Sequence, residues 1–261
     1  MSLALCLASN LLNIKIYIFE PNSVLGRANK LMLNFAEKII CYDENLKGIS
    51  KKLLHKIYLV KPLLRKEIYK YKKNQKTKIA EKKKLLIIGG SQGTKFFDKV
   101  ITKIIIRLSK IHKLQVLQQV TNLNSKENIK KLYQKNHIEH ALFDFDDKLL
   151  NKAVNYDLAI TRSGASTISE LGYLNIPFVA IPFPYAKDDH QYYNAKFYEK
   201  KNCCWLIMQK DIDEESFKDL IIKIFVDKNE YISKKNNLIQ LNKENTWEKN
   251  KYKLIELLNE N

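Results

Sequence analysis

The stretch LAITRSGASTISELGYLNIPFVAIPFPYAKDDHQYYNA, residues 158–195, contains two successive transitions from strand to loop to helix. Each transition begins with a short apolar run of the kind that forms a buried strand. A loop of small, hydroxylated or proline residues follows, and then a helix. This alternation predicts an α/β fold with an open parallel sheet, in which ligands bind at the carboxyl ends of the strands. Helix N-termini there offer N–H groups to anions, so the sequence predicts a phosphate-bearing ligand.

Glycines are concentrated in loops of the same kind. The chain has seven glycines, and four of them lie between a predicted strand and a predicted helix: Gly89, Gly90, Gly93 and Gly164. In Gly89-Gly-Ser-Gln-Gly93 the glycines let the backbone approach an anion closely, and Ser91 can donate a hydroxyl hydrogen bond. The motif matches neither G-x-G-x-x-G nor a P-loop, so a tight structural turn is the alternative interpretation.

Length and composition indicate a globular protein of a reducing compartment. The 261 residues are 45% hydrophobic and 10% aromatic, which excludes a disordered chain. The four cysteines show no pairing pattern. No apolar stretch approaches the roughly 20 residues that span a bilayer. The apolar start of the chain, residues 1–12, is interpreted as a core helix rather than a signal peptide.

The net charge of +18 predicts attraction to a polyanion or to an anionic membrane face. Lysines are spread along the chain, and arginines are scarce and not clustered with aromatic residues. Nucleic acid is therefore not a predicted partner. A bias of the genome toward lysine, asparagine and isoleucine is an alternative origin of the charge.

Four zones follow one another along the chain. Short helices and strands alternate over residues 1–69. A charged stretch without apolar periodicity predicts a solvated basic linker over 70–84. A regular series of strands and helices fills 85–227, and two helical segments form a tail over 228–261.

The loop Arg162-Ser-Gly-Ala-Ser-Thr-Ile-Ser-Glu170 offers N–H groups and hydroxyls at a helix start. Glu170 lies one turn into that helix, where a carboxylate can accept two hydrogen bonds from a vicinal diol such as a ribose. The alternative is that Ser166 and Ser169 cap the helix and that Glu170 is a favourable charge near its dipole.

Two further polar stretches begin helices. In Lys187-Asp-Asp-His-Gln-Tyr-Tyr-Asn-Ala195, Gln191 and Asn194 are three residues apart and share one helix face, from which they could reach one sugar. A polar helix start is the alternative. Asp144-Phe-Asp146 contains the Asp-x-Asp pattern that holds a divalent metal in some glycosyltransferases. Here the acids precede a helix, which favours dipole and capping roles, and we predict no metal.

Taken together and in order, these motifs resemble the bacterial MurG family, the N-acetylglucosaminyltransferases that convert lipid I to lipid II in peptidoglycan synthesis. The similar run extends from about Ile18 to Phe225. Residues 20–29 resemble the family's Glu-Gln-Asn loop, and Lys61-Pro-Leu-Leu-Arg65 resembles its Gly-Asn-Pro-Val-Arg segment without the Gly-Asn.

The resemblance implies a GT-B architecture, with a complete C-terminal and a partial N-terminal Rossmann-like domain facing a cleft. UDP-GlcNAc would bind mainly to the C-terminal domain, with no cofactor. By position in the motifs, Arg65 and Ser91 would contact the diphosphate, Phe145 would lie beside the uracil and Glu170 would hold the ribose. Gln191 and Asn194 would hold the GlcNAc hydroxyls, and Asn22 would reach the sugar from across the cleft. Ala165, Ser166 and Thr167 would present backbone donors and hydroxyls to phosphate, and Ile168 and Ser169 would belong to the same substrate-binding helix start.

The implied reaction is an inverting transfer in which the MurNAc 4-hydroxyl of undecaprenyl-linked lipid I attacks the anomeric carbon and UDP leaves. Its implied place is the cytoplasmic face of the inner membrane, with peripheral attachment. Members of the family begin with a glycine-rich loop that contributes to acceptor binding and to the general base. The chain has no such loop, so no catalytic residue is predicted. The alternative function is a UDP-GlcNAc-binding subunit or fragment that is inactive alone.

Overall fold

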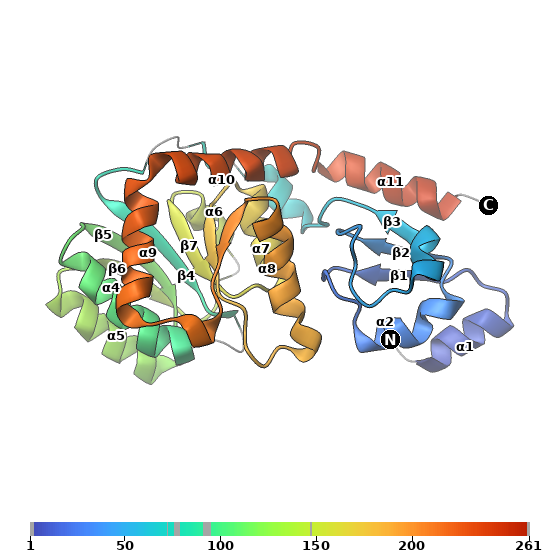
Figure 1. Cartoon of the computed structure of the whole chain (residues 1–261), viewed down its shortest axis with the longest axis horizontal. Coiled ribbons are helices and arrows are strands. Elements are labelled where there is room, and N and C mark those ends of the chain that lie inside the picture. Colours follow the sequence, from blue (N-terminus) through green and yellow to red (C-terminus); the bar gives the residue numbers. More distant parts are fainter. Residues whose placement is uncertain (1–2, 72, 76–78, 91–94, 147, 260–261) are drawn as a thin grey trace.

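The computed structural model describes residues 3–71, 73–75, 79–90, 95–146 and 148–259. Within these residues the chain forms two parallel sheets, a small one in the order β1-β2-β3 and a large one in the order β6-β5-β4-β7-β8-β9. Figure 1 shows the two sheets at opposite ends of the molecule, each with its own helices. The predicted α/β class with parallel sheets is confirmed.

The small sheet is built from the first 60 residues. Its strands are β1 (Tyr17–Glu20), β2 (Lys38–Cys41) and β3 (Ile57–Leu59), accompanied by helices α1 (Leu3–Leu11) and α2 (Arg27–Met32) and by short 3₁₀ segments at Leu33–Phe35 and Lys51–Lys56. The helix that begins at Arg27 is α-helical as far as Met32 and continues as the 3₁₀ turn Leu33–Phe35. Ile18, Ile39 and Leu25 form the centre of its core.

The large sheet follows the predicted order of strands and helices, with ends shifted by a few residues. Its strands are β4 (Lys83–Ile88), β5 (Leu114–Gln119), β6 (Glu139–Phe143), β7 (Leu158–Thr161), β8 (Phe178–Ala180) and β9 (Cys204–Leu206). The connecting helices are a π-helical segment (Phe97–Ile101), α4 (Thr102–Ser109), α5 (Leu123–Lys135), α6 (Leu149–Ala153), α7 (Ala165–Tyr173), α8 (His190–Lys200) and α9 (Glu214–Val226).

Both faces of the large sheet are covered, because side chains alternate along its strands. Leu85 and Ile87 of β4 point into a core shared with α4, α5 and α9. Leu86 and Ile88 point the other way, into a core shared with α6, α7 and α8. Because both faces of these strands are buried, their sequences are continuously apolar. Polar side chains that could contact a ligand therefore lie at the carboxyl edge of the sheet.

The solvated linker predicted over 70–84 is wrong at Asn74, which is buried. Its backbone N–H donates to the carbonyl of Leu174 at 2.8 Å, and its Nδ2 donates to the carbonyl of Tyr156 at 2.8 Å. Lys235 Nζ donates to Asn74 Oδ1 at 2.8 Å. An asparagine whose polar groups are bonded can be buried at small cost, so this segment is fastened to the large sheet's helices.

The tail joins the two halves. Helix α10 (Lys228–Leu241) packs on the large sheet through Leu238, and α11 (Trp247–Asn259) extends over the small sheet (Figure 1). There Leu257 packs against Ile40 and Val60. None of the helices in the described part of the chain has the length and apolar character needed to cross a membrane.

Candidate functional site

The loops after β7 and β8 are fastened together by one side chain at the start of α8. Gln191 Oε1 accepts a hydrogen bond from the backbone N–H of Ser163 at 3.1 Å and another from that of Phe183 at 3.0 Å. Its Nε2 donates to no other residue within the described ranges. The side chain thus holds both loops in place and keeps a hydrogen-bond donor for a ligand.

Asn194, one turn further along α8, links the two sheets. Its side chain is 3% exposed. Its Nδ2 donates to Asn22 Oδ1 at 3.0 Å and to the carbonyl of Ser163 at 3.1 Å, and its Oδ1 accepts from the N–H of Ser23 at 2.9 Å. Two of the three predicted sugar contacts, Asn22 and Asn194, are therefore hydrogen-bonded to one another between the two sheets.

The loop that carries Asn22 is organised by a buried carboxylate. Glu20 accepts hydrogen bonds from the N–H of Asn22 at 3.1 Å, from the side-chain amides of Asn22 and Asn29 at 2.9 Å, and from the N–H of Gly26 at 2.8 Å. Four N–H donors thus converge on this one carboxylate. Glu20 thereby fixes the loop that faces α8.

The predicted diphosphate and ribose contacts form an ion pair. Arg65 Nε lies 3.5 Å from Glu170 Oε1, although the two residues are far apart in sequence. The Arg65 side chain is 58% exposed and that of Glu170 is 15% exposed. Burial raises the pKa of Glu170, and the charge of Arg65 opposes that rise.

The start of α7 has no side-chain cap, since its N-cap residue is Gly164. The alternative interpretation of Ser166 and Ser169 as caps is therefore wrong. Ala165, Ser166 and Thr167 occupy the first turn, where backbone N–H groups have no partner within the helix. The Ile168 N–H donates to the carbonyl of Gly164 and its side chain is in the core.

Ser169 is also turned inward, where its Oγ accepts from Tyr198 OH at 3.4 Å. The side chains of Ile168 and Ser169 are thus packed inside the protein, and the first turn of α7 is the more exposed part of the predicted binding stretch. Their contact with substrate stays a prediction.

A second bridge joins the loops after β4 and β6. Gln119, the last residue of β5, accepts from the N–H of Gly90 at 2.9 Å and donates to the carbonyl of Asp144 at 3.1 Å. Phe145, the predicted neighbour of the uracil, is 82% exposed beside it. The position of Ser91 lies outside the described residues.

Asp146 does not cap α6, whose N-cap residue is Lys148, but it is engaged by residues just before and within that helix. It accepts from the N–H of Lys148 at 2.9 Å and from Lys152 Nζ at 2.7 Å, and the Lys152 contact lowers its pKa.

Comparison with known proteins identifies this arrangement. Residues 84–251 match the glycosyltransferase family 28 C-terminal domain. A UDP-N-acetylglucosamine–N-acetylmuramyl-(pentapeptide) pyrophosphoryl-undecaprenol N-acetylglucosamine transferase of Pelagibacter ubique is 46% identical over the whole chain, which covers 72% of that protein. The protein of the same name from Rickettsia bellii is 34% identical over 91% of the chain and 68% of its own length. The chain belongs to the MurG family.

The fold agrees with this family. The crystal structure of Acinetobacter baumannii MurG superposes with a TM-score of 0.76 at 22% identity, covering 97% of this chain and 69% of that one. The predicted GT-B type is confirmed.

One residue of this MurG-family edge that sequence reasoning passed over is Arg162, the first residue after β7. It is buried, and its Nη1 donates to the carbonyls of Ile181 at 3.1 Å and Pro182 at 3.0 Å. Burial lowers its pKa to about 10. The signal was an arginine placed directly after an apolar strand in a chain with few arginines.

Proposed function

We propose that this chain binds UDP-GlcNAc at the carboxyl edge of the large sheet and transfers GlcNAc to the MurNAc 4-hydroxyl of lipid I, which gives lipid II. The curated relatives that carry this activity in their names support the proposal. The observation on which it rests is the Arg65–Glu170 pair, which places a cation beside a carboxylate one turn into α7, the helix whose first turn has no side-chain cap.

The arrangement suggests a division of roles along the nucleotide sugar. The backbone N–H groups of residues 165–167 and the guanidinium of Arg65 hold the diphosphate, since both attract negative charge. Glu170 accepts from the ribose hydroxyls, and Phe145 lies beside the uracil. Gln191 Nε2 donates to a hydroxyl of GlcNAc.

Asn22 and Asn194 have a positioning role in this proposal. Their mutual hydrogen bond sets the distance between the two sheets next to the sugar.

Transfer requires the diphosphate to leave with increased negative charge. Fixed N–H dipoles and an arginine at its position stabilise that charge without reorganising, and one such donor contributes about 3 kcal/mol in known enzymes. The first turn of α7 supplies the dipoles, and Arg65 supplies the cation. This chemistry uses no cofactor.

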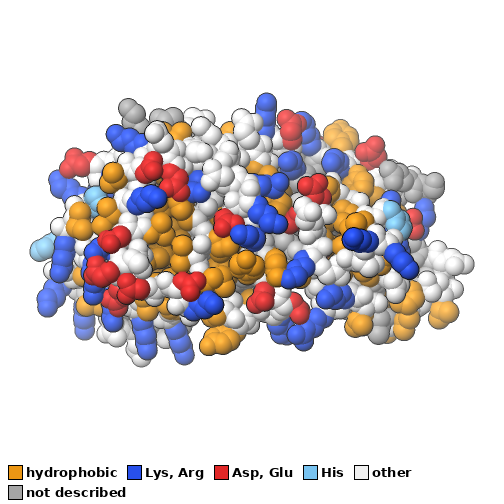
Figure 2. Space-filling model, viewed as in Figure 1, with side chains coloured by type: hydrophobic (Ala, Val, Ile, Leu, Met, Phe, Trp, Pro, Cys, Tyr) orange, Lys and Arg blue, Asp and Glu red, His pale blue; other side chains and the backbone are white. Residues whose placement is uncertain are grey.

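We further propose peripheral attachment to the cytoplasmic face of the bacterial inner membrane, where a lipid-linked acceptor is found. The net charge of +18 supports attraction to anionic lipids. Figure 2 shows lysine and arginine side chains spread over both halves of one face.

We propose the following division into domains. Residues 1–69 form the acceptor-side domain and residues 85–227 form the UDP-sugar domain, with 70–84 between them and 228–261 as the tail.

The test is calorimetric titration of the purified chain with UDP and UDP-GlcNAc. Glu170→Ala removes two charge-assisted hydrogen bonds to the ribose, so the affinity should fall about 10- to 100-fold. Glu127→Ala, at an exposed glutamate of α5, is the matched control and should leave the affinity unchanged. Equal affinities of wild type and Glu170→Ala would contradict the ribose role. Release of UDP on addition of lipid I tests the transfer step.

A further inference from the structure

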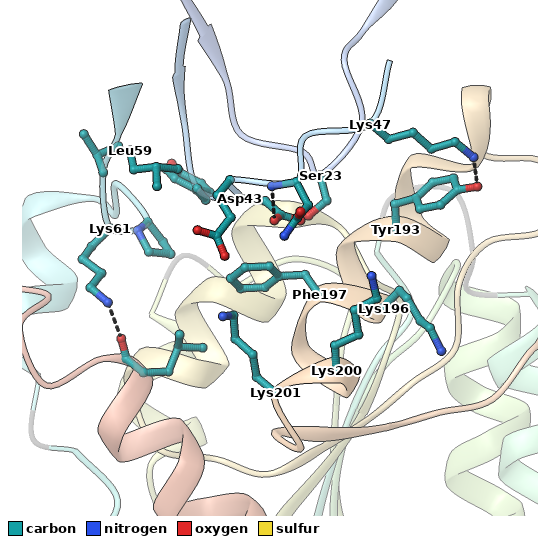
Figure 3. A pocket seen from close by; sticks show the side chains of 16 residues that line it. Ser23, Asp43, Lys47, Leu59, Lys61, Tyr193, Lys196, Phe197, Lys200 and Lys201 are labelled. Atoms are coloured by element: carbon teal, nitrogen blue, oxygen red, sulfur yellow. Dashed lines mark hydrogen bonds between the residues drawn. The ribbon is translucent and has the colours of Figure 1, made fainter. Parts of the chain in front are cut away.

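A further cavity borders α8 from Tyr193 to the end of the helix, on a side that Gln191 and Asn194 do not line. Its volume is about 550 Å³. The walls are Ser23 in the loop after β1, the loops that follow β2 and β3, α8 from Tyr193 onward, and the end of α10 (Figure 3). No residue assigned above to UDP-GlcNAc lines it.

The cavity is strongly cationic. The lysines among its lining residues are Lys47, Lys61, Lys196, Lys200 and Lys201, against the two carboxylates of Asp43 and Glu44. Among the described residues, no ion pair joins either carboxylate to these lysines. Lys196 is paired with Glu199 at 2.6 Å, and Lys200 and Lys201 at the end of α8 are exposed. The positive charge of this wall is therefore largely uncompensated within the protein.

Lys61 lies close enough to other positively charged lysines to be repelled by them. Lys61 Nζ donates to the carbonyl of Leu241 at 3.1 Å, and its pKa is lowered by burial and by the neighbouring charges of Lys201 and Lys253. Gathering like charges around a partly enclosed space costs free energy, which a bound anion recovers. Lysine offers only donors, so the complementary group is an acceptor-rich anion.

Apart from Ser23 and Asn45, the rest of the lining is apolar and aromatic. Tyr42, Tyr193 and Phe197 form part of it, with Leu59 and Pro62. Figure 3 shows Phe197 between Asp43 on one side and Lys201 on the other. Lys201 Nζ lies 5.0 Å from the centroid of the Phe197 ring. A cavity of this size with apolar walls and a few charged groups is typical of a small-molecule site.

We propose that this cavity is a second ligand site, which takes a small organic phosphate through Lys200 and Lys201 and holds its body against Tyr42 and Phe197. The site is independent of the nucleotide site. The phosphate belongs either to a soluble phosphorylated metabolite or to the headgroup of a lipid.

Pyrophosphate is the probe, titrated by calorimetry in saturating UDP so that the nucleotide site is occupied. The Lys200→Ala/Lys201→Ala double variant should bind pyrophosphate at least about tenfold more weakly, because two charge-assisted contacts are lost. Lys130→Ala/Lys131→Ala removes two adjacent exposed lysines of α5 and is the matched control. It should change the affinity by less than about twofold, since exposed charges are well screened.

A variant that should strengthen pyrophosphate binding provides a second test. Asp43→Asn keeps the oxygen that accepts from the N–H of Asn45 and removes one repulsive charge. Pyrophosphate should therefore bind about two- to fivefold more tightly. Equal weakening by the two lysine pairs, or unchanged affinity in Asp43→Asn, would overturn the proposal.

Vesicles of phosphatidylglycerol in phosphatidylcholine, compared with pure phosphatidylcholine, separate the two sources. Vesicle binding that is lost in Lys200→Ala/Lys201→Ala but kept in the α5 control identifies a lipid headgroup. Unchanged vesicle binding with lost pyrophosphate binding identifies a soluble phosphate. Displacement of pyrophosphate by UDP would mean that only one site exists, and would overturn the inference. If UDP itself does not bind, the comparison of the two lysine pairs still shows whether pyrophosphate binds through Lys200 and Lys201.

Discussion

The two ends of α8 present opposite kinds of surface within eleven residues. At the first turns, Gln191 and Asn194 have their side-chain oxygens occupied by backbone N–H groups of neighbouring loops. At the last turn, Lys200 and Lys201 project into an open cavity and are exposed. One helix thus carries a fixed polar network at one end and a solvated cationic wall at the other.

The difference separates two ways of preparing a binding site. A hydrogen-bonded network in a buried position holds its geometry before a ligand arrives, and removing one member leaves other buried groups unpaired. Exposed lysines are not held in a fixed geometry in this way, and they attract an anion by charge alone. Substitutions at Gln191 and Asn194 should therefore change the stability of the protein and the geometry of the nucleotide site. Substitutions at Lys200 and Lys201 should change only the affinity for the ligand of the cavity.

The largest expected effect is that of Asn194→Ala. The substitution leaves the N–H of Ser23, the carbonyl of Ser163 and Asn22 Oδ1 without their partner. Unpaired buried polar groups cost about 1–3 kcal/mol, so the free energy of unfolding should fall by about 2–3 kcal/mol. Urea unfolding followed by circular dichroism measures the change.

The comparison predicts a contrasting result at the other end of the helix. Lys200→Ala/Lys201→Ala should alter the free energy of unfolding by less than about 0.5 kcal/mol, because exposed side chains outside buried networks contribute little. Comparable losses in the two variants would break the distinction between the two ends of α8.

The next effect in size concerns pH. Burial raises the pKa of Glu170. Its ionised form accepts both ribose hydrogen bonds, so UDP affinity should weaken as the pH falls through this raised pKa, by up to about tenfold. Glu170→Gln should remove this dependence, and Arg65→Ala should move its midpoint to higher pH. Calorimetric titrations with UDP between acid and neutral pH test this, and identical profiles for wild type and Glu170→Gln would contradict it.

Sequence patterns were sufficient for the large sheet and for the motifs along its edge. Strands such as β4 and β7 are continuous apolar runs followed by small residues, and local signals of this kind survive packing. The start of α7 and the polar face of α8 were predicted for the same reason. Contiguous residues carry that information.

Other features depend on residues that meet only in the fold. Arg65 reaches Glu170, and Asn22 reaches Asn194, across separations that no local pattern encodes. The cationic cavity gathers side chains from separate segments of the chain, from Ser23 to Leu241, and no single motif contains its lysines. Asn74 was assigned to solvent because its neighbours are charged, whereas a buried lysine and two carbonyls satisfy it.

A smaller effect is expected from Gln119→Ala. This side chain bridges the N–H of Gly90 and the carbonyl of Asp144, so its loss loosens the loops after β4 and β6. One lost hydrogen bond of about 1 kcal/mol corresponds to about fivefold weaker UDP binding. Gln115→Ala, on the same strand away from the edge, is the matched control and should bind UDP normally. Equal affinities for the two variants would remove Gln119 from the site.

The smallest expected effect is that of metal removal. Asp146 is already engaged by the N–H of Lys148 and by Lys152 Nζ, and Asp144 Oδ1 accepts from the N–H of Phe145. A metal would have to displace a lysine and the backbone donors, whereas the dipoles of α7 and Arg65 already face the diphosphate in our proposal. EDTA should therefore leave the calorimetric affinity for UDP-GlcNAc unchanged. A clear loss, restored by added Mg²⁺ or Mn²⁺ in wild type but not in Asp144→Asn, would move the diphosphate contact from α7 to the Asp144–Asp146 loop.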